Sequence, residues 1–451
     1  MAVHSPPRDL KMRIGKIAPA LAMALVVATT AACGGGSGDG SAAGGPKELT
    51  YWASNQGTSL DNDKAILQPE LDKFEKASGI KVKVEVVPWT DLLNRILAAT
   101  TSGQGPDVLN IGNTWSASLQ ATGAFVPFDD AALEKVGGKA RFLGPSLAAT
   151  GAQGQPPVGV PLYGQAYGLY YNKKLFADAG ITSPPATWEE LIADGKKLTD
   201  PAKGQWGMSL QAGQVTENSH HAAILGAQQG ATFFGKDGKP QLASDQAVAA
   251  VQQHIDLMQK DKIVNPSNAE YADTAKSLKD LADGKAAMFM NQASEGSFKN
   301  IGADLSNIGV APIPLPATPP PGGRKVTSFV AGINLSVFQN TKNKDAALDF
   351  VKFMLSAPEQ AILNNAYGSL PTVQDAYSDP KFQTSDVKVF QNVLANTAEP
   401  MPQVPQESQF ETLIGTAMKA MFADVAAGKP VDAAKIKSQL TQADQQIAAG
   451  N

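Results

Sequence analysis

The sequence has a single cysteine and no long apolar run beyond its start, and both shortages exclude classes of protein. Cys33 is the only cysteine among 451 residues, so no intrachain disulfide can form and burial of apolar surface must stabilise the fold. Lys and Arg number 38 against 42 Asp and Glu, without a basic run, and the formal net charge is −4. This balance argues against binding to nucleic acid or to an anionic membrane surface, which attract clustered positive charge.

The start of the chain is organised like an export signal followed by a tether. Basic residues precede an apolar run over residues 17–32, which is shorter than the about 20 residues of a transmembrane helix. Cys33 follows at once, and the next residues are almost entirely Gly, Ser and Ala. This arrangement resembles a bacterial lipoprotein signal, which implies removal of residues 1–32, a lipid on Cys33 and a flexible tether over 33–46. Thr30 departs from the Leu or Val usual in that signal, and a buried free cysteine in a secreted protein is the alternative.

Strand and helix patterns alternate through the rest of the chain. Residues 48–52, 82–86 and 107–111 have the pattern of short strands, and helical patterns separate them. Alternation at this spacing predicts an α/β domain with a largely parallel sheet. Residues 312–321 contain six prolines and are expected to form an external loop. The chain is too long for one small domain and fits two.

Three motifs that could carry chemistry are weak. Residues 230–237 nearly match a phosphate-binding loop but lack the Ser or Thr that reaches magnesium. Glu217, His220 and His221 could gather as metal ligands, but adjacent side chains on a helix point about 100° apart, which favours a surface or sugar-contacting pair. Glycoside hydrolysis needs two carboxylates that face a cleft, and the acidic residues of the sequence neither indicate such a pair nor exclude it.

Tryptophans indicate a candidate binding site. Trp52 and Trp115 follow predicted strands, and ligands of open α/β sheets bind beyond the carboxyl ends of the strands. The two residues before Trp115 are polar. Flat aromatic faces and directional polar groups suit a sugar, whose C–H faces stack on rings and whose hydroxyls form hydrogen bonds. Trp89 and Trp188 are interpreted instead as core residues.

Five segments in order resemble the carbohydrate-binding extracellular solute-binding proteins of bacterial ABC importers, the family related to maltose-binding protein. The resemblance extends over nearly all of residues 47–451. Its most specific part is YGLYYNK at 167–173 leading to PATWEEL at 185–191. The other segments are 106–115, 284–288, 331–334 with 342–347, and 401–410.

The resemblance implies an α/β fold of two lobes, joined by hinge crossovers, with the ligand cleft between the lobes. In this interpretation residues 47–159 form lobe 1 and residues 310–366 return to it. Residues 160–309 form lobe 2, to which residues 367–451 return. The protein is then expected to be a monomer.

The resemblance also implies which loops contact the ligand. Glu411 stands where maltose-binding protein has a stacking aromatic ring, and residues 293–296 replace a Trp that many relatives carry, so a subsite more polar than one for maltodextrin is expected. No catalytic residue, metal ligand or cofactor is expected. The predicted ligand-binding residues are Trp52, Ser54, Gln56, Asn113, Thr114, Trp115, Gln165, Glu217, Asn218, His220, Asn291, Glu295, Phe329, Gly332 and Glu411.

The expected function is capture of a di- or oligosaccharide outside the cell and its delivery to the membrane subunits of an ABC permease. The protein would be held by its lipid on the extracellular face of the cell membrane and would perform no chemistry. A secreted glycoside hydrolase is the alternative from another class. A metal-capture lipoprotein that uses His220 and His221 is a third possibility.

Overall fold

The computed structural model describes residues 48–292 and 295–450. The predicted signal, the tether and Cys33 therefore lie outside the described residues. Within the described part of the chain, no helix is both long and apolar enough to cross a membrane.

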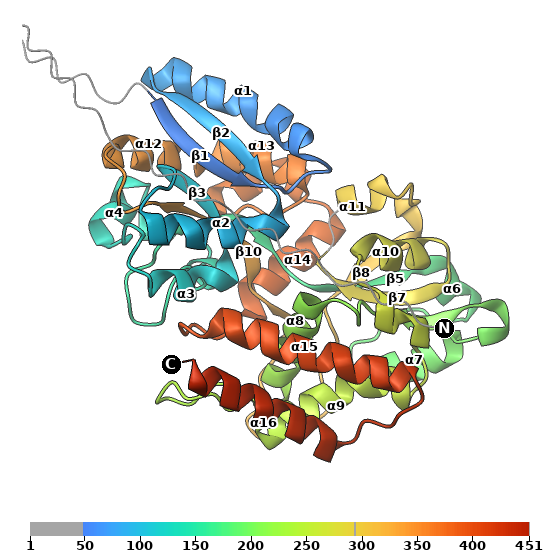
Figure 1. Ribbon diagram of the computed structural model, residues 1–451. Coiled ribbons are helices and arrows are strands. Elements are labelled where there is room, and N and C mark those ends of the chain that lie inside the picture. The colour runs from blue at the N-terminus through green and yellow to red at the C-terminus, as the bar shows by residue number, and fades with distance from the viewer. Residues whose placement is uncertain (1–47, 293–294, 451) are drawn as a thin grey trace, which may run out of the picture. The chain divides into compact units, whose positions relative to one another are not determined.

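A five-stranded sheet combines strands from distant parts of the chain, in the order β2–β1–β3–β10–β4 (Figure 1). The strands are β1 (Glu48–Ser54), β2 (Lys81–Val87), β3 (Val108–Gly112), β4 (Val160–Gln165) and β10 (Ala331–Val337). β1 is parallel to β2 and β3, as the alternation of strands and helices predicts. β10 is antiparallel to β3 and β4, because this strand returns from a much later segment in the opposite direction.

A four-stranded sheet has the order β6–β7–β5–β8. Its strands are β5 (Gly168–Asn172), β6 (Trp206–Ser209), β7 (Ala286–Asn291) and β8 (Ile308–Ala311). Only β6 and β7 are parallel, whereas β5 is antiparallel to both β7 and β8. The expectation of a largely parallel sheet is therefore wrong for this second sheet. A parallel pair, β9 (Ser328–Phe329) and β11 (Ala398–Glu399), stands apart from both sheets.

Helices accompany both sheets. Those from the first part of the chain and from the return segment are α1 (Leu60–Ser78), α2 (Trp89–Ser102), α3 (Ser116–Gln120), α4 (Asp130–Lys135), α5 (Gly144–Ala148), α12 (Lys344–Met354) and α13 (Ala357–Tyr367). The others are α6 (Lys173–Asp178), α7 (Trp188–Leu198), α8 (Val215–Gln229), α9 (Asp245–Gln259), α10 (Thr274–Ala282), α11 (Glu295–Asn300), α14 (Ser385–Asn396), α15 (Glu407–Ala426) and α16 (Ala433–Ala449). Short 3₁₀ turns occupy Asn113–Trp115, Lys139–Arg141, Pro201–Lys203, Pro266–Glu270, Leu305–Asn307, Gln374–Ser378 and Pro380–Phe382.

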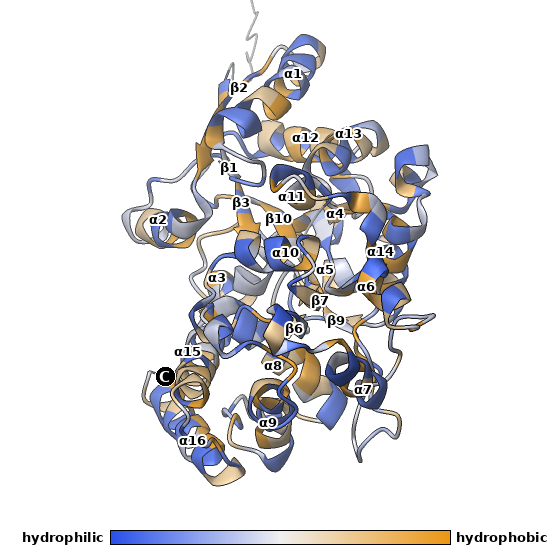
Figure 2. Cartoon of the chain, turned by 90° about the vertical axis from the view of Figure 1, so that its right-hand side faces the viewer, coloured by the Kyte–Doolittle hydropathy of each residue, from blue (hydrophilic) through white to orange (hydrophobic). Residues whose placement is uncertain are grey.

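Each sheet has its own apolar core. Around the first sheet, Phe350 contacts Tyr51 and Phe74 edge to face, with ring centroids 5.4 and 5.2 Å apart. Around the second, α15 and α16 pack on α8 and α9 and bury Phe410 and Phe422 (Figure 1). The hydrophobic colouring of β3 and β10 in Figure 2 agrees with their burial. These two cores, together with three smaller apolar clusters, supply the burial that a chain without disulfides needs.

Local signals place several elements where the sequence predicts them. Thr187 caps α7 and accepts a hydrogen bond from the backbone N–H of Glu190, and the carboxylate of Glu190 accepts the backbone N–H of Thr187, so the two residues form a capping box. Residues 312–321 form no helix or strand, as their prolines require. Gly79 ends α1 with a positive φ of 73°, a conformation that glycine adopts without strain.

The chain passes from the first sheet to the second through residues 166–167, between β4 and β5. β4, which lies in the segment expected to belong to lobe 2, pairs with β10 in the five-stranded sheet. The segment expected to form lobe 2 ends at residue 309, within β8, and β8 belongs to the four-stranded sheet.

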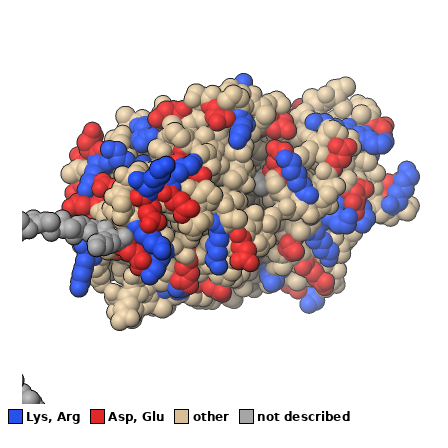
Figure 3. Space-filling view, turned by 90° about the horizontal axis from the view of Figure 1, so that it is seen from above, with Lys and Arg blue, Asp and Glu red and all other residues tan. Residues whose placement is uncertain are grey.

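Charged side chains of both signs are interspersed over the face in Figure 3. This face carries no extended patch of a single sign, in keeping with the balanced composition of the sequence.

Candidate functional site

A cavity of about 290 Å³ brings together residues from elements that accompany both sheets. The segments that follow the carboxyl ends of β1, β2 and β3 contribute to it, and so do α8, α15 and the start of β10. Such ends are where α/β sheets bind ligands. We call this cavity the central pocket. It is lined by Gln56, Trp89, Gly112, Asn113, Thr114, Trp115, Gln165, Gln214, Thr216, Glu217, His220, Gln292, Phe329, Ala331, Gly332, Ile333 and Glu411.

Two stacked indoles form one wall of the central pocket. The rings of Trp89 and Trp115 lie nearly parallel, at 23°, with centroids 4.5 Å apart. Trp115 is 7% exposed and packs into a small apolar cluster, whereas Trp89 is 40% exposed. The pair offers a flat apolar surface of the kind that stacks against the C–H face of a sugar ring.

Gly112 allows this pair to lie close to the backbone of β3. A Cβ atom at this position would stand 2.9 Å from the Trp115 ring and 3.0 Å from the Trp89 ring. These distances are shorter than any ordinary carbon contact, so a side chain here would displace the rings.

Substitution of Gly112 therefore tests the wall directly. Gly112→Ala is expected to weaken ligand binding about two- to tenfold, because loss of the aromatic pairing costs about 0.5–1.5 kcal/mol. Isothermal calorimetry on the folded variant measures this change. Gly144→Ala is the matched control, since a Cβ atom there meets nothing within 4 Å. Equal affinity of both variants and the unchanged protein would contradict the role of the wall.

The loop that carries Gln56 is fixed by a buried carboxylate. Asp63, in the first turn of α1, accepts the backbone N–H of Gly57 at 2.8 Å and also hydrogen-bonds the side chain of Asn55. Asp63 is fully buried, and its position at a helix N-terminus favours its negative charge. The loop after β1 is thus held in place before any ligand arrives.

A chain of polar contacts joins Glu217, His220 and Glu411 of the pocket lining to residues behind it. The hydroxyl of Tyr167 donates to Glu217 Oε2 at 2.8 Å and lies 2.7 Å from His220 Nδ1. The amide of Asn291 donates to the same oxygen of Glu217 at 3.1 Å. His220 Nε2 lies 3.3 Å from Glu411 Oε1. Burial raises the pKa of Glu217, and burial beside this carboxylate raises the pKa of Tyr167 well above its ordinary value, so the phenol keeps its proton.

The two adjacent histidines of α8 point to different surroundings. His220 lines the central pocket, whereas His221 donates from Nδ1 to the backbone carbonyl of Glu217 and stacks on His254 with ring centroids 4.8 Å apart. Burial lowers the pKa of His221 to about 4 and that of His254 well below its ordinary value. Among the described residues there is no group of three or more His, Cys, Asp or Glu side chains arranged to hold a metal ion.

The central pocket brings together ten of the fifteen predicted ligand-binding residues, and these come from distant parts of the sequence. The ten are Gln56, Asn113, Thr114, Trp115, Gln165, Glu217, His220, Phe329, Gly332 and Glu411. Asn113 already uses its amide to donate to the carbonyl of Val330, which holds β3 against the segment before β10.

The other five predicted residues do not line this pocket. The guanidinium carbon of Arg95 lies over the indole of Trp52, 4.0 Å from the centroid of that ring. Asn218 donates to the carbonyl of Ala212, just before α8, and the amide of Asn291 donates to Glu217. The remaining two are Ser54, which is buried and whose backbone N–H donates to Asn110 Oδ1 on β3, and Glu295.

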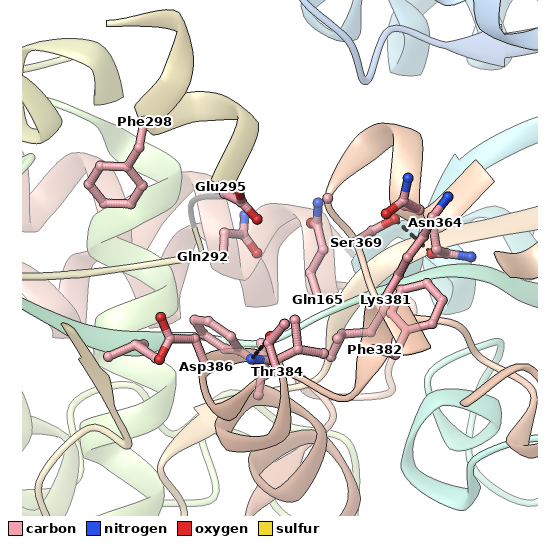
Figure 4. Close-up of a pocket in the computed structure, with 18 of the residues that line it drawn as sticks. Gln165, Gln292, Glu295, Phe298, Asn364, Ser369, Lys381, Phe382, Thr384 and Asp386 are labelled. Carbon is pink, nitrogen blue, oxygen red and sulfur yellow. Dashed lines mark hydrogen bonds between the residues drawn. The ribbon is translucent and has the colours of Figure 1, made fainter. Parts of the chain in front are cut away.

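Glu295 lines a second cavity, of about 340 Å³, which lies beside the central pocket (Figure 4). Gln165 and Gln292 line both cavities, and Figure 4 shows them near Glu295. Asn364 and Ser369, joined by a hydrogen bond of 2.7 Å, lie farther along the second cavity.

Sequence reasoning missed Trp89 and placed Trp188 correctly. Trp188 is 4% exposed and its indole N–H donates to Gln228, so its interpretation as a core residue is confirmed. The same interpretation of Trp89 is wrong, because it lines the pocket. The signal that could have identified it is its place just after the carboxyl end of β2, equivalent to that of Trp115 after β3. Gln214, Thr216 and Gln292 complete the polar lining without a distinctive sequence signal.

Comparison with known proteins places this architecture in a family. The family model described as bacterial extracellular solute-binding protein matches residues 57–361. The diacetylchitobiose binding protein of Streptomyces coelicolor (strain ATCC BAA-471 / A3(2) / M145) is 28% identical over 393 residues, which are 86% of this chain and 87% of that protein. A maltooligosaccharide ABC transporter solute-binding lipoprotein of Streptococcus pneumoniae (strain ATCC BAA-255 / R6) is 25% identical over 386 residues, 80% of this chain and 81% of that one.

A solved structure shows the same fold. The maltose-bound MalE3 of T. maritima superposes with a TM-score of 0.72 at 22% identity and covers 90% of this chain and 100% of its own. This similarity confirms the α/β fold with two lobes that the sequence predicts.

Proposed function

The chain belongs to the bacterial extracellular solute-binding proteins, and we propose that it captures a di- or oligosaccharide outside the cell and delivers it, as a monomer, to the permease of an ABC transporter. The family consists of ligand-binding proteins of transporters. We propose that this chain likewise binds its ligand and releases it chemically unchanged. The relatives named for diacetylchitobiose and for maltooligosaccharides support a carbohydrate as the ligand.

The central pocket carries this proposal. Its lining combines the stacked indoles of Trp89 and Trp115 with polar side chains that include Glu217, His220 and Glu411. A stacking surface and several hydrogen-bonding groups in one cavity are what a sugar ring requires, because its faces are apolar and its edges carry hydroxyls.

Thermal unfolding in the presence of a panel of sugars tests the function. A ligand at about 100 times its dissociation constant adds about 2.7 kcal/mol to the free energy of unfolding, so a binding sugar raises the melting temperature measurably. Chromatography of the same sugar after incubation should recover it intact. Recovery of shorter products would instead favour a glycoside hydrolase, and the lack of a shift with any carbohydrate would overturn the proposal.

We also propose that the two sheets form the cores of two lobes, divided near the boundaries expected from sequence, that rotate toward each other when sugar binds. A ligand between two lobes stays half exposed unless the lobes close over it. Small-angle scattering should therefore show a smaller radius of gyration at saturating sugar. If the radius of gyration stayed unchanged while calorimetry showed that sugar saturates the protein, closure of the lobes would be contradicted. The proposal that the protein captures sugar would still stand.

We further propose that Cys33 carries a lipid that anchors the protein to the extracellular face of the cell membrane. The basic start, the short apolar run and the Gly/Ser-rich tether of the sequence support this anchor, and so does the lipoprotein among the relatives. Cys33→Ser is expected to move the protein from the membrane fraction to the soluble or secreted fraction, as measured by immunoblotting of fractionated cells. Retention of the variant in the membrane at the unchanged level would refute the anchor.

A further inference from the structure

Two cavities of similar size adjoin, and the same two glutamines line both of them. The central pocket has a volume of about 290 Å³ and the second cavity one of about 340 Å³. Gln165, the last residue of β4, and Gln292, which follows β7, belong to both linings (Figure 4). Pockets for small ligands have volumes of about 300–1,000 Å³, so each cavity alone is near the lower limit, whereas the two together lie well within this range.

The side chains of these two glutamines lack hydrogen-bond partners. Gln292 Oε1 is buried and has no partner. Gln165 forms no side-chain hydrogen bond with any described residue. Nearby amides differ, since that of Asn291 donates to two side-chain oxygens at 2.9 and 3.1 Å, and that of Asn364 donates to a backbone carbonyl at 2.9 Å. The junction of the two cavities is therefore a place where a ligand can supply missing partners.

A sugar ring has the groups that these amides need. A buried amide oxygen without a donor is costly, so a ligand that donates to it gains free energy on binding. Each carboxamide both donates and accepts, and so does each hydroxyl of a sugar. Adjacent hydroxyls on one ring can thus satisfy a carboxamide in both directions.

The second cavity combines the same kinds of groups as the central pocket. Phe390 of α14 lines it, is half-buried and packs against Tyr170 with ring centroids 5.8 Å apart. Lys381, Thr384 and Asp386 are exposed residues of its lining (Figure 4). An aromatic surface and hydrogen-bonding groups in one cavity suit a further sugar ring.

We propose that one oligosaccharide of at least three rings occupies both cavities. One ring stacks on the indole wall of the central pocket. The next ring lies at the junction and hydrogen-bonds Gln165 and Gln292, and a third ring enters the second cavity beside Phe390. The inference rests on the proposed function and narrows its ligand to carbohydrates longer than a disaccharide.

Sugars that differ only in length test the proposal. The probes are three series of one to five rings, built from α-1,4-linked glucose, β-1,4-linked glucose or β-1,4-linked N-acetylglucosamine. Calorimetry is expected to show that in at least one series the trisaccharide binds at least about tenfold more tightly than the disaccharide. The reason is that the third ring adds both apolar contact and hydrogen bonds in the second cavity.

A variant that fills the second cavity locates the third ring. Val387→Trp places an indole in the lining of that cavity and is expected to remove the advantage of the trisaccharide, while the affinity for the disaccharide stays unchanged. Lys388→Trp is the matched control and should keep the advantage, because this neighbour on α14 is exposed and lines neither cavity. Thermal melting confirms that each variant is folded.

A second variant tests the junction. Gln292→Leu has a side chain of similar size without the amide and is expected to weaken binding of the trisaccharide about tenfold. Its stability in urea should not fall, because a buried oxygen without a partner does not stabilise the free protein. Unchanged affinity of this variant for the trisaccharide would show that no ring is held at the junction.

The possible outcomes separate this inference from the proposed function. If no trisaccharide binds more tightly than its disaccharide, or if Val387→Trp keeps the advantage of the trisaccharide, the inference is overturned and sugar capture stands. If no carbohydrate of any length binds, the inference and the proposed function fail together.

Discussion

Replacement of Trp115 by alanine is expected to weaken sugar binding at least about tenfold and also to destabilise the protein. The indole stacks on Trp89 in the wall of the central pocket, and such stacking contributes about 1 kcal/mol beyond the burial of apolar area, which adds more. The other side of Trp115 packs among Ile96, Leu109 and Leu119 and is nearly inaccessible to solvent. Removal of a buried tryptophan costs about 3–5 kcal/mol of stability, and the pocket side places this variant near the lower value.

Two other tryptophans separate the two effects. Trp89→Ala is expected to lose affinity with a small loss of stability, because Trp89 is half exposed and lies at the mouth of the same wall. Trp188→Ala is expected to lose about 3–5 kcal/mol of stability and no affinity, because Trp188 lies in the core of the second sheet. Calorimetry measures the affinity and urea unfolding measures the stability, both on each variant.

The combination of results decides the role of Trp115. A loss of stability with unchanged affinity would make Trp115 a core residue only and would move the sugar away from this wall. If Trp188→Ala lost as much affinity as Trp115→Ala, the losses of affinity would reflect destabilisation of the whole protein and not the loss of a direct contact between Trp115 and the sugar.

The sequence predicts much of the site because the carboxyl ends of strands are recognisable. Trp115 follows β3 directly, and its neighbours Asn113 and Thr114 reach the pocket with it. Trp89 follows β2 in the same way but is interpreted from the sequence as a core residue, and a sequence pattern does not show which side of a helix faces a cleft. Long-range contacts such as that of His220 with Glu411 could be expected only from the resemblance, since no local rule joins residues so distant in sequence.

The position at which β1 ends explains why Trp52, a predicted ligand-binding residue, does not line the central pocket. The sequence favours a strand that ends at Trp52, which would place this indole at the carboxyl edge of the sheet. In the structure β1 continues to Ser54, so Trp52 lies within the strand and packs beside Arg95, while Gln56 becomes the residue that reaches the pocket. Side chains alternate between the two faces of a strand, and a shift of two residues at its end changes which of them reaches the ligand.

Acidification is expected to destabilise the protein through His221. Burial lowers the pKa of this imidazole from 6.5 to about 4, so the folded protein holds it neutral, whereas the unfolded chain binds a proton below about pH 6.5. The stabilising contribution is therefore complete above pH 6.5 and is lost as the pH falls toward 4. A difference of that size corresponds to about 3 kcal/mol in the free energy of unfolding.

His221→Gln isolates this contribution from the other titrating groups. The buried carboxyl groups Glu217 and Glu407, whose pKa values are raised, change stability in the opposite direction, so the pH profile of one protein alone mixes both effects. The amide of Gln can retain a hydrogen bond to the carbonyl of Glu217 but does not titrate. In urea unfolding from pH 7 to pH 4, the advantage of the unchanged protein over His221→Gln should shrink by up to about 3 kcal/mol. An advantage that stays constant across this range would show that His221 keeps its ordinary pKa, and acid sensitivity would then have to come from other groups.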